Sequence, residues 1–251
     1  MDLVRFLRTH CPWDAAQTHR SLIPYLLEEA AETADAITDG DDSALRSELG
    51  DLLLNIAFQL VLAEERAAFT AEEAADTVID KMRRRHPHLY GTGERQDWET
   101  LKARERDEAA SGHDEAASIL HGVARGLDPL SKAHRIQDRV AAIGFDWADA
   151  TGAFEKVAEE LEEVREALAV SASSPAAALE EELGDLLFAV VNLTRLAGAH
   201  ALNALHGANA KFTARFEALE RLAAERRIAL DEAGLETLDR LWDEIKAAER
   251  P

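Results

Sequence analysis

Glu48-Leu-Gly-Asp-Leu-Leu-Leu-Asn-Ile-Ala-Phe-Gln-Leu-Val-Leu62 is an almost wholly apolar run with polar residues at helical spacing. Positions 48, 51, 55 and 59 fall on one narrow stripe of a helix, and Gly50 is the only other non-apolar residue between 49 and 62. Such a helix is predicted to be buried nearly all round. An acidic stripe inside a bundle is costly unless its charges are paired or bind a metal.

The chain contains this unit twice. Five features recur in the same order about 130 residues apart, which is hard to attribute to chance. In the first copy the features are Cys11–Asp14, Leu26–Glu32, Ser47–Leu53, Lys81 and Arg85. Their counterparts in the second copy, in the same order, are Gly144–Trp147, Ala158–Glu163, Glu181–Leu187, Lys211 and Arg215.

Helices are expected throughout. Apolar residues from 22 to 37 form a helical stripe, residues 38–43 break it, and a second helix is predicted over 44–67. The later copy breaks at 171–175 instead. No segment shows sustained strand alternation, and glycine (13) and proline (6) are sparse, so the sequence predicts an all-α fold.

The repeat also predicts the domain organisation. We expect a first helical unit over residues 1–110 and a second over 111–251. The connector, about residues 91–118, is charged and dotted with glycine, with a short helix predicted around 98–108.

Composition limits the classes of partner. The formal charge of −21 argues against a general nucleic-acid binder, which needs cations along a phosphate track. A small phosphorylated substrate stays open if a divalent cation stands between it and the acidic residues. The single cysteine, Cys11, cannot form an internal disulfide, and no apolar stretch is long enough for a membrane span. We therefore expect a soluble, cytoplasmic protein.

The carboxylates form the main candidate site. Each copy reads Glu-Glu-x-x-Glu, a break, and then Glu-x-x-Asp, so residues three apart share a helical face and four carboxylates converge if the two helices pack antiparallel. The predicted groups are Glu29, Glu32, Glu48 and Asp51 in the first copy, and Glu160, Glu163, Glu182 and Asp185 in the second, with Glu28 and Glu159 at their edges.

The simpler interpretation is that these carboxylates are solvated residues of amphipathic helices. The second helix of each copy is mostly apolar, which argues against that interpretation. Carboxylates without a histidine or cysteine partner are hard oxygen ligands that suit Mg²⁺ or Mn²⁺. A di-iron bundle would show Glu-x-x-His on two helices, and no histidine here follows a glutamate at that spacing.

Two lysine–arginine pairs could hold phosphates. Lys211 and Arg215 share a helical face, as do Lys81 and Arg85 in the first copy, and each pair could equally be a surface pair. Trp13 or Trp147 could line a base pocket, and Trp242 could stack on a base or pack in the core.

These residues resemble the MazG family of nucleoside triphosphate pyrophosphohydrolases in its two-copy bacterial form. The matching segments are Cys11-Pro-Trp-Asp14, Tyr25-Leu-Leu-Glu-Glu29, Glu48-Leu-Gly-Asp51, Arg84-Arg-His-Pro-His88, Gly144-Phe-Asp-Trp147, Glu182-Leu-Gly-Asp-Leu-Leu-Phe188 and Ala210-Lys-Phe212. The implied fold is two tandem MazG-like helical units with carboxylate-lined four-helix-bundle sites. The resemblance also implies a homodimer in which helices of two subunits form the bundle.

The resemblance implies hydrolysis of an NTP or dNTP to a monophosphate and pyrophosphate. By this resemblance, the eight carboxylates already named are Mg²⁺ ligands. The implied substrate contacts are Lys211, Arg215, Arg135, Asn192 and Trp242. An edge glutamate, Glu159 or Glu28, is the candidate base for the attacking water. The family often has lysine where this chain has Ala178 and Arg135, and the cation at position 178 is missing from the second copy.

Two other functions fit the same features. One is a narrow-substrate all-α pyrophosphatase, for example one specific for dUTP, which a panel of nucleotides would distinguish. The other is a non-catalytic dimeric scaffold with vestigial sites, against which both copies keep four carboxylates and a lysine–arginine pair.

Overall fold

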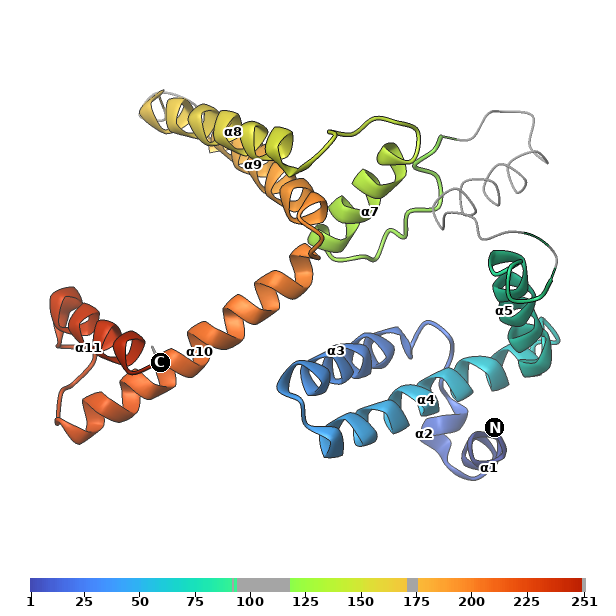
Figure 1. The fold of residues 1–251 in the computed structure, drawn as a ribbon. Helices are drawn as coiled ribbons and strands as arrows, with labels where there is room; N and C mark the ends of the chain where they lie inside the picture. The colour runs from blue at the N-terminus through green and yellow to red at the C-terminus, as the bar shows by residue number, and fades with distance from the viewer. Residues whose placement is uncertain (92, 94–117, 171–175, 250–251) are drawn as a thin grey trace. The chain divides into compact units, whose positions relative to one another are not determined.

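The computed structural model describes residues 1–91, 93, 118–170 and 176–249. Every regular element within those ranges is a helix, as predicted (Figure 1). The chain divides into two compact units, residues 1–102 and 103–251. Apart from residues 91, 93 and 118, the predicted connector and its helix lie outside the described residues, as does the break at 171–175.

The first unit is organised around a helical hairpin. Gly40, with φ of +69°, ends the first arm in a left-handed conformation, and Asp41 then caps the second arm by accepting hydrogen bonds from the backbone N–H groups of Ser43 and Ala44. The helices of this unit are α1 (Asp2–His10), α2 (Pro12–Ala15), α3 (Ile23–Asp39), α4 (Asp42–Glu65) and α5 (Ala71–Arg85), and α3 and α4 form the hairpin.

The core of the first unit lies at the C-terminal end of α4. Val4 of α1 and Leu22 pack there against three buried residues of α4, Phe58, Val61 and Leu62. A salt bridge holds α1 against α4, because Arg8 of α1 donates to both carboxylate oxygens of Glu65 in α4, at 2.6 and 2.8 Å. The N-terminal half of α4, which carries Glu48 and Asp51, therefore lies outside this core.

The second unit repeats the hairpin and adds helices around it. Gln137 of α7 is buried and donates a hydrogen bond to the backbone carbonyl of Phe188 in α9, while Leu219 of α10 and Leu241 of α11 are the centre of a separate small core. The helices are α7 (Pro129–Ala141), α8 (Ala150–Val170), α9 (Ala176–Leu196), α10 (Ala201–Glu225) and α11 (Gly234–Ala248), with α8 and α9 paired (Figure 1).

Each hairpin exposes an apolar face. The prediction that the helix around residues 49–62 is buried nearly all round is therefore wrong for the single chain, because the unit supplies too few helices to cover both sides of α4. On α4 the side chains of Leu49, Leu53 and Ile56 are exposed, and on α8 those of Phe154 and Leu161 are 62% and 58% exposed. Similar residues extend both faces: Leu27 and Ile37 on α3, and Leu183, Leu187 and Val190 on α9.

No single helix among the described residues has both the length and the apolarity needed to cross a membrane. The bent pair formed by residues 177–196 and 201–225 meets those two requirements only when its two helices are taken together.

Candidate metal and substrate site

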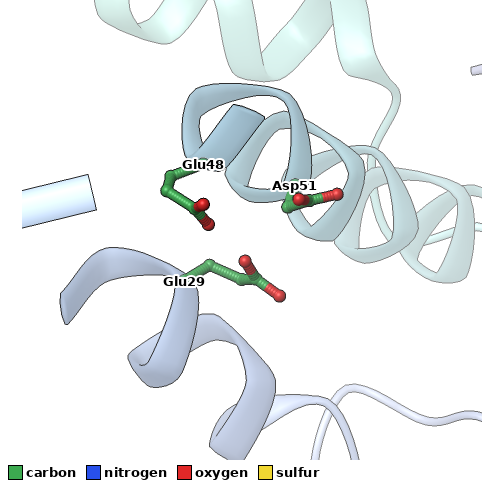
Figure 2. A group of neighbouring side chains, drawn as sticks. All are labelled: Glu29, Glu48 and Asp51. Carbon is green, nitrogen blue, oxygen red and sulfur yellow. The ribbon is translucent and has the colours of Figure 1, made fainter. Parts of the chain in front are cut away.

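Three carboxylates meet between the arms of the first hairpin. Glu29 of α3 faces Glu48 and Asp51 of α4, and one oxygen from each lies within 4.8 Å of the others (Figure 2). Glu32 adjoins the group, since partial loss of water and the negative charges of Glu48 and Asp51 raise the pKa of its carboxyl. The helical spacing thus brings the four predicted residues of this copy together.

The second hairpin holds an equivalent group with a more deeply buried member. Oxygens of Glu160, Glu163 and Glu182 lie within 4.8 Å of one another. Glu160 is only 5% exposed, and its Oε2 is buried without a hydrogen-bond partner. A buried, unpartnered carboxylate oxygen is costly, and a cation would satisfy it. The fourth predicted residue, Asp185, lies beside Glu160 in the wall of a neighbouring cavity.

The positively charged side chain of Lys156 lies beside the second carboxylate group. Its Nζ is 2.7 Å from Glu160 and 2.8 Å from Glu159, and both distances are those of charge-assisted hydrogen bonds. These two carboxylates raise the pKa of the lysine, so it stays protonated. The first copy has Tyr25 at the equivalent position, four residues before Glu29, where it makes an edge contact with Trp13.

Partial loss of water and crowding raise the pKa of three carboxylates. The pKa values of Glu29, Glu32 and Glu163 are all raised above the usual 4.5, first by partial loss of water and then by neighbouring negative charges. A divalent cation would remove this repulsion. The donor set is purely oxygen, which fits Mg²⁺ or Mn²⁺ better than a softer metal.

The predicted phosphate contacts of the second copy lie elsewhere in the single chain. Arg215 of α10 donates to Glu249, with its closest nitrogen 2.6 Å from the carboxylate, and Lys211 lies near enough to lower the pKa of Glu249. Trp242 of α11 packs against Phe212, with ring centroids 5.2 Å apart. These three residues belong to the α10–α11 pair and not to the α8–α9 carboxylate group.

The other predicted contacts are similarly dispersed. Arg135 of α7 is exposed and lies 3.5 Å from Asp138. Lys81 and Arg85 are half-buried on α5, which starts at the C-terminal end of α4, where the Ala71 N–H donates to Glu64. Glu48 and Asp51 lie near the opposite end of α4. Asn192 is the exception, since it lines the same cavity as Glu160 and Asp185.

Three residues around the carboxylate group of the second hairpin were not predicted from the sequence. Lys156 lies three and four residues before Glu159 and Glu160, a spacing that predicts contact on a helix. Arg195 lies three residues after Asn192 and donates to it, and also to Asp146 of the Gly144-Phe-Asp-Trp147 segment. Helical spacing could have revealed the first two, whereas the Arg195–Asp146 contact joins residues 49 apart.

Binding of Mg²⁺ is expected to raise the melting temperature more at pH 8 than at pH 5. The folded protein holds the protons of Glu29, Glu32 and Glu163 more tightly than the unfolded chain, so without metal it loses stability as the pH rises above 4.5 and these protons leave. At pH 5 those protons also compete with the metal. At 100 times its dissociation constant, the metal contributes about 2.7 kcal/mol, which corresponds to a rise of roughly 5–11 °C for a chain of this length.

Differential scanning fluorimetry at both pH values would measure this effect. NaCl at equal ionic strength is the control for screening, which acts on all surface charges. An equal rise with NaCl, or the same rise with Mg²⁺ at both pH values, would contradict a carboxylate metal site.

Comparisons with known proteins agree with this architecture. The family model for the MazG nucleotide pyrophosphohydrolase domain matches residues 17–90 and 151–219, so it covers both hairpins. The nucleoside triphosphate pyrophosphohydrolase/pyrophosphatase MazG of Thermotoga maritima is 39% identical over 95% of this chain and 90% of its own length. The nucleoside triphosphate pyrophosphohydrolase of Escherichia coli K12 is also 39% identical, over 99% of this chain and 95% of its own.

The resemblance seen in the motifs is therefore confirmed over nearly the whole chain. Both matched segments carry the Glu-Glu-x-x-Glu and Glu-x-x-Asp residues that the structure brings together. The chain belongs to the MazG family of nucleotide pyrophosphohydrolases and contains the family's domain twice.

Proposed function

We propose that this protein is a Mg²⁺-dependent nucleoside triphosphate pyrophosphohydrolase that converts an NTP or dNTP and water to the monophosphate and pyrophosphate. The observation that carries the proposal is the group formed by Glu160, Glu163 and Glu182, with the unpartnered oxygen of Glu160 buried within it. Both full-length relatives carry the name of this activity.

The metal ligands proposed in the second copy are Glu160, Glu163, Glu182 and Asp185, and those in the first are Glu29, Glu32, Glu48 and Asp51. A bound divalent cation offsets charge on triphosphate oxygens and lowers the pKa of an attacking water. Lys156 neutralises Glu160 in the metal-free chain, and can turn to the phosphates once that carboxylate has another positive partner. The first copy has Tyr25 in place of this lysine. We therefore propose that the second copy carries turnover.

Glu159 is the proposed base for the attacking water, and Glu28 is its counterpart in the first copy. The Glu159 side chain is 58% exposed and is held by Lys156 next to Glu160, so it can accept a proton without being a metal ligand. Water then attacks the α-phosphorus as Glu159 takes its proton. The bond from the α-phosphorus to the pyrophosphate leaving group breaks, and Glu159 later loses the proton to solvent.

Replacing Glu159 with glutamine is expected to lower kcat about a hundredfold, since general base catalysis typically contributes that much or more. The rise in melting temperature with Mg²⁺ should stay as in the wild type. Glu28→Gln is the matched control in the other copy and should leave turnover intact. If Glu159→Gln retains full activity, another group or bulk water accepts the proton.

The assembled enzyme is proposed to be a homodimer. The exposed apolar faces of the α3–α4 and α8–α9 hairpins have the periodicity of helix-packing surfaces, and a second subunit would complete each hairpin to a four-helix bundle. That assembly would also have to bring the other proposed substrate contacts to the carboxylates. These are Lys211, Arg215, Arg135 and Trp242 for the second copy, and Lys81 and Arg85 for the first.

Product analysis tests the reaction itself. The eight common NTPs and dNTPs would be incubated with Mg²⁺ or EDTA and followed by phosphorus NMR. Monophosphate and pyrophosphate should form only with Mg²⁺. Diphosphate and inorganic phosphate would indicate a different bond cleaved, and turnover of dUTP alone would indicate a narrow-substrate enzyme.

A further inference from the structure

A small cavity adjoins the second carboxylate group. Its volume is about 190 Å³, below the roughly 300–1,000 Å³ of sites that enclose a whole small molecule, so it can take one part of a nucleotide. Its lining is partly polar, with Lys156, Glu160 and Asp185, and partly aromatic, with Trp147 and Phe188. Aromatic walls beside a phosphate-binding group suit a nucleobase, which stacks on flat side chains.

Trp147, which is 44% exposed, packs against α8 in this wall. Its backbone N–H donates to Asp146 Oδ1 at 3.0 Å, and its indole lies directly on Gly152 in the first turn of α8. A Cβ at position 152 would lie 2.2 Å from Trp147 Cδ1, so only glycine allows this approach. The aromatic wall is thus built into the fold and does not depend on a ligand.

Asn192 also lines the cavity, and its side-chain orientation is fixed. It is 6% exposed, and its Oδ1 accepts hydrogen bonds from Arg195 Nε at 3.0 Å and Arg195 Nη2 at 2.6 Å. A guanidinium only donates, so the amide oxygen must face Arg195 and the NH₂ group must point away from it. Within the described ranges, we find no hydrogen bond from that NH₂ group to the protein.

Arg195 is itself anchored. Its side chain is 13% exposed, and the nitrogen that holds Asn192 also donates to Asp146 Oδ1 at 2.6 Å. Asp146 therefore accepts from both Arg195 and the Trp147 backbone. One carboxylate connects the donor amide with the aromatic wall.

We propose that Arg195, anchored by Asp146, is a positioning residue that fixes the Asn192 amide so that its NH₂ group donates to an acceptor atom of the nucleobase. This inference rests on the proposed function for the presence of a nucleotide, and it deepens that function by assigning the base subsite of the second copy. Asn192 contacts substrate, and Arg195 acts only through Asn192.

A double-mutant cycle tests the coupling. Isothermal titration calorimetry with Mg²⁺ would measure the Kd of the non-hydrolysable α,β-methylene analogue of ATP for the wild type, Asn192→Ala, Arg195→Lys and the double variant. Lysine keeps the charge but cannot donate in a fork to Asn192 and also reach Asp146. Each single change should raise Kd about tenfold, as expected for the loss of one hydrogen bond, and the double variant should match Asn192→Ala.

Pyrophosphate is the control ligand, because it has no base. Its Kd should stay within twofold in all four proteins. If Arg195→Lys raises the Kd of the analogue as much in the Asn192→Ala background as alone, Arg195 acts independently and the inference is wrong. An equal loss of pyrophosphate affinity would place the contact on the phosphates and also overturn it.

Two further measurements keep the outcomes distinct. Asp146→Asn, made in the wild-type and Asn192→Ala backgrounds, provides the same cycle if Arg195→Lys does not fold. Pyrophosphate release from ATP by the wild type is followed separately, so a chain that binds the analogue with the expected coupling but has no turnover would contradict the proposed function and not the base subsite.

Discussion

Replacing Glu182 with glutamine is expected to lower kcat/KM for pyrophosphate release at least about a hundredfold. Loss of a residue that merely supports a metal ligand typically costs 10- to 100-fold, and Glu182 is itself a proposed ligand. Its carboxylate lies within 4.8 Å of Glu160 and Glu163, so the amide removes one negative charge from the centre of the group. The Mg²⁺-dependent rise in melting temperature should shrink as well.

Two matched variants separate this effect from general damage. Glu181 is the adjacent residue on α9 and is exposed, so Glu181→Gln should change the rate less than twofold. Glu48→Gln removes the equivalent carboxylate of the first copy and should leave most of the turnover. Comparable losses in Glu182→Gln and Glu181→Gln would mean that the rate depends on the overall charge of α9 and not on a metal ligand.

Replacing Lys156 with methionine is expected to lower kcat/KM by about 10²- to 10³-fold, the usual cost of removing one group that stabilises developing charge. Methionine keeps much of the apolar stem but not the ammonium that lies 2.7 Å from Glu160. Without metal, the buried Glu160 carboxylate also loses its cation, so the melting temperature should fall. Mg²⁺ should then stabilise the variant more than it stabilises the wild type, because a second cation restores the balance of charge.

Steady-state kinetics and thermal melts with and without Mg²⁺ would measure both effects. Lys132 is an exposed lysine of α7, and Lys132→Met is the control for loss of one positive charge. Lys156→Arg should recover part of the activity, since it keeps the charge with a different shape. Activity within threefold of the wild type in Lys156→Met would show that the lysine only balances Glu160.

Most of the fold and the carboxylate sites could be predicted from local sequence. Glu29 and Glu32, or Glu48 and Asp51, share a face because helical geometry places residues three apart together, and Gly40 and Asp41 mark the turn between their helices. The structure confirms the all-α class and brings these residues together. The repeat then transfers the same reasoning to the second copy.

Contacts between distant residues could not be predicted in this way. Arg215 shares a helical face with Lys211, but nothing in the spacing shows that its partner is Glu249, 34 residues away. The burial of the helix over 49–62 was overestimated because an apolar pattern does not say whether the covering helix belongs to the same chain. The donor orientation of Asn192 depends on Arg195 and Asp146, which meet only through the fold.

We propose that the second copy holds the Mg²⁺-dependent nucleoside triphosphate pyrophosphohydrolase site. Pyrophosphate release tests this assignment when the wild type, Glu163→Ala and Glu32→Ala are each assayed with Mg²⁺ and with EDTA. We expect Mg²⁺-dependent release by the wild type and by Glu32→Ala, and release near the EDTA background by Glu163→Ala. Undiminished release by Glu163→Ala, or release by the wild type in EDTA, would contradict the account.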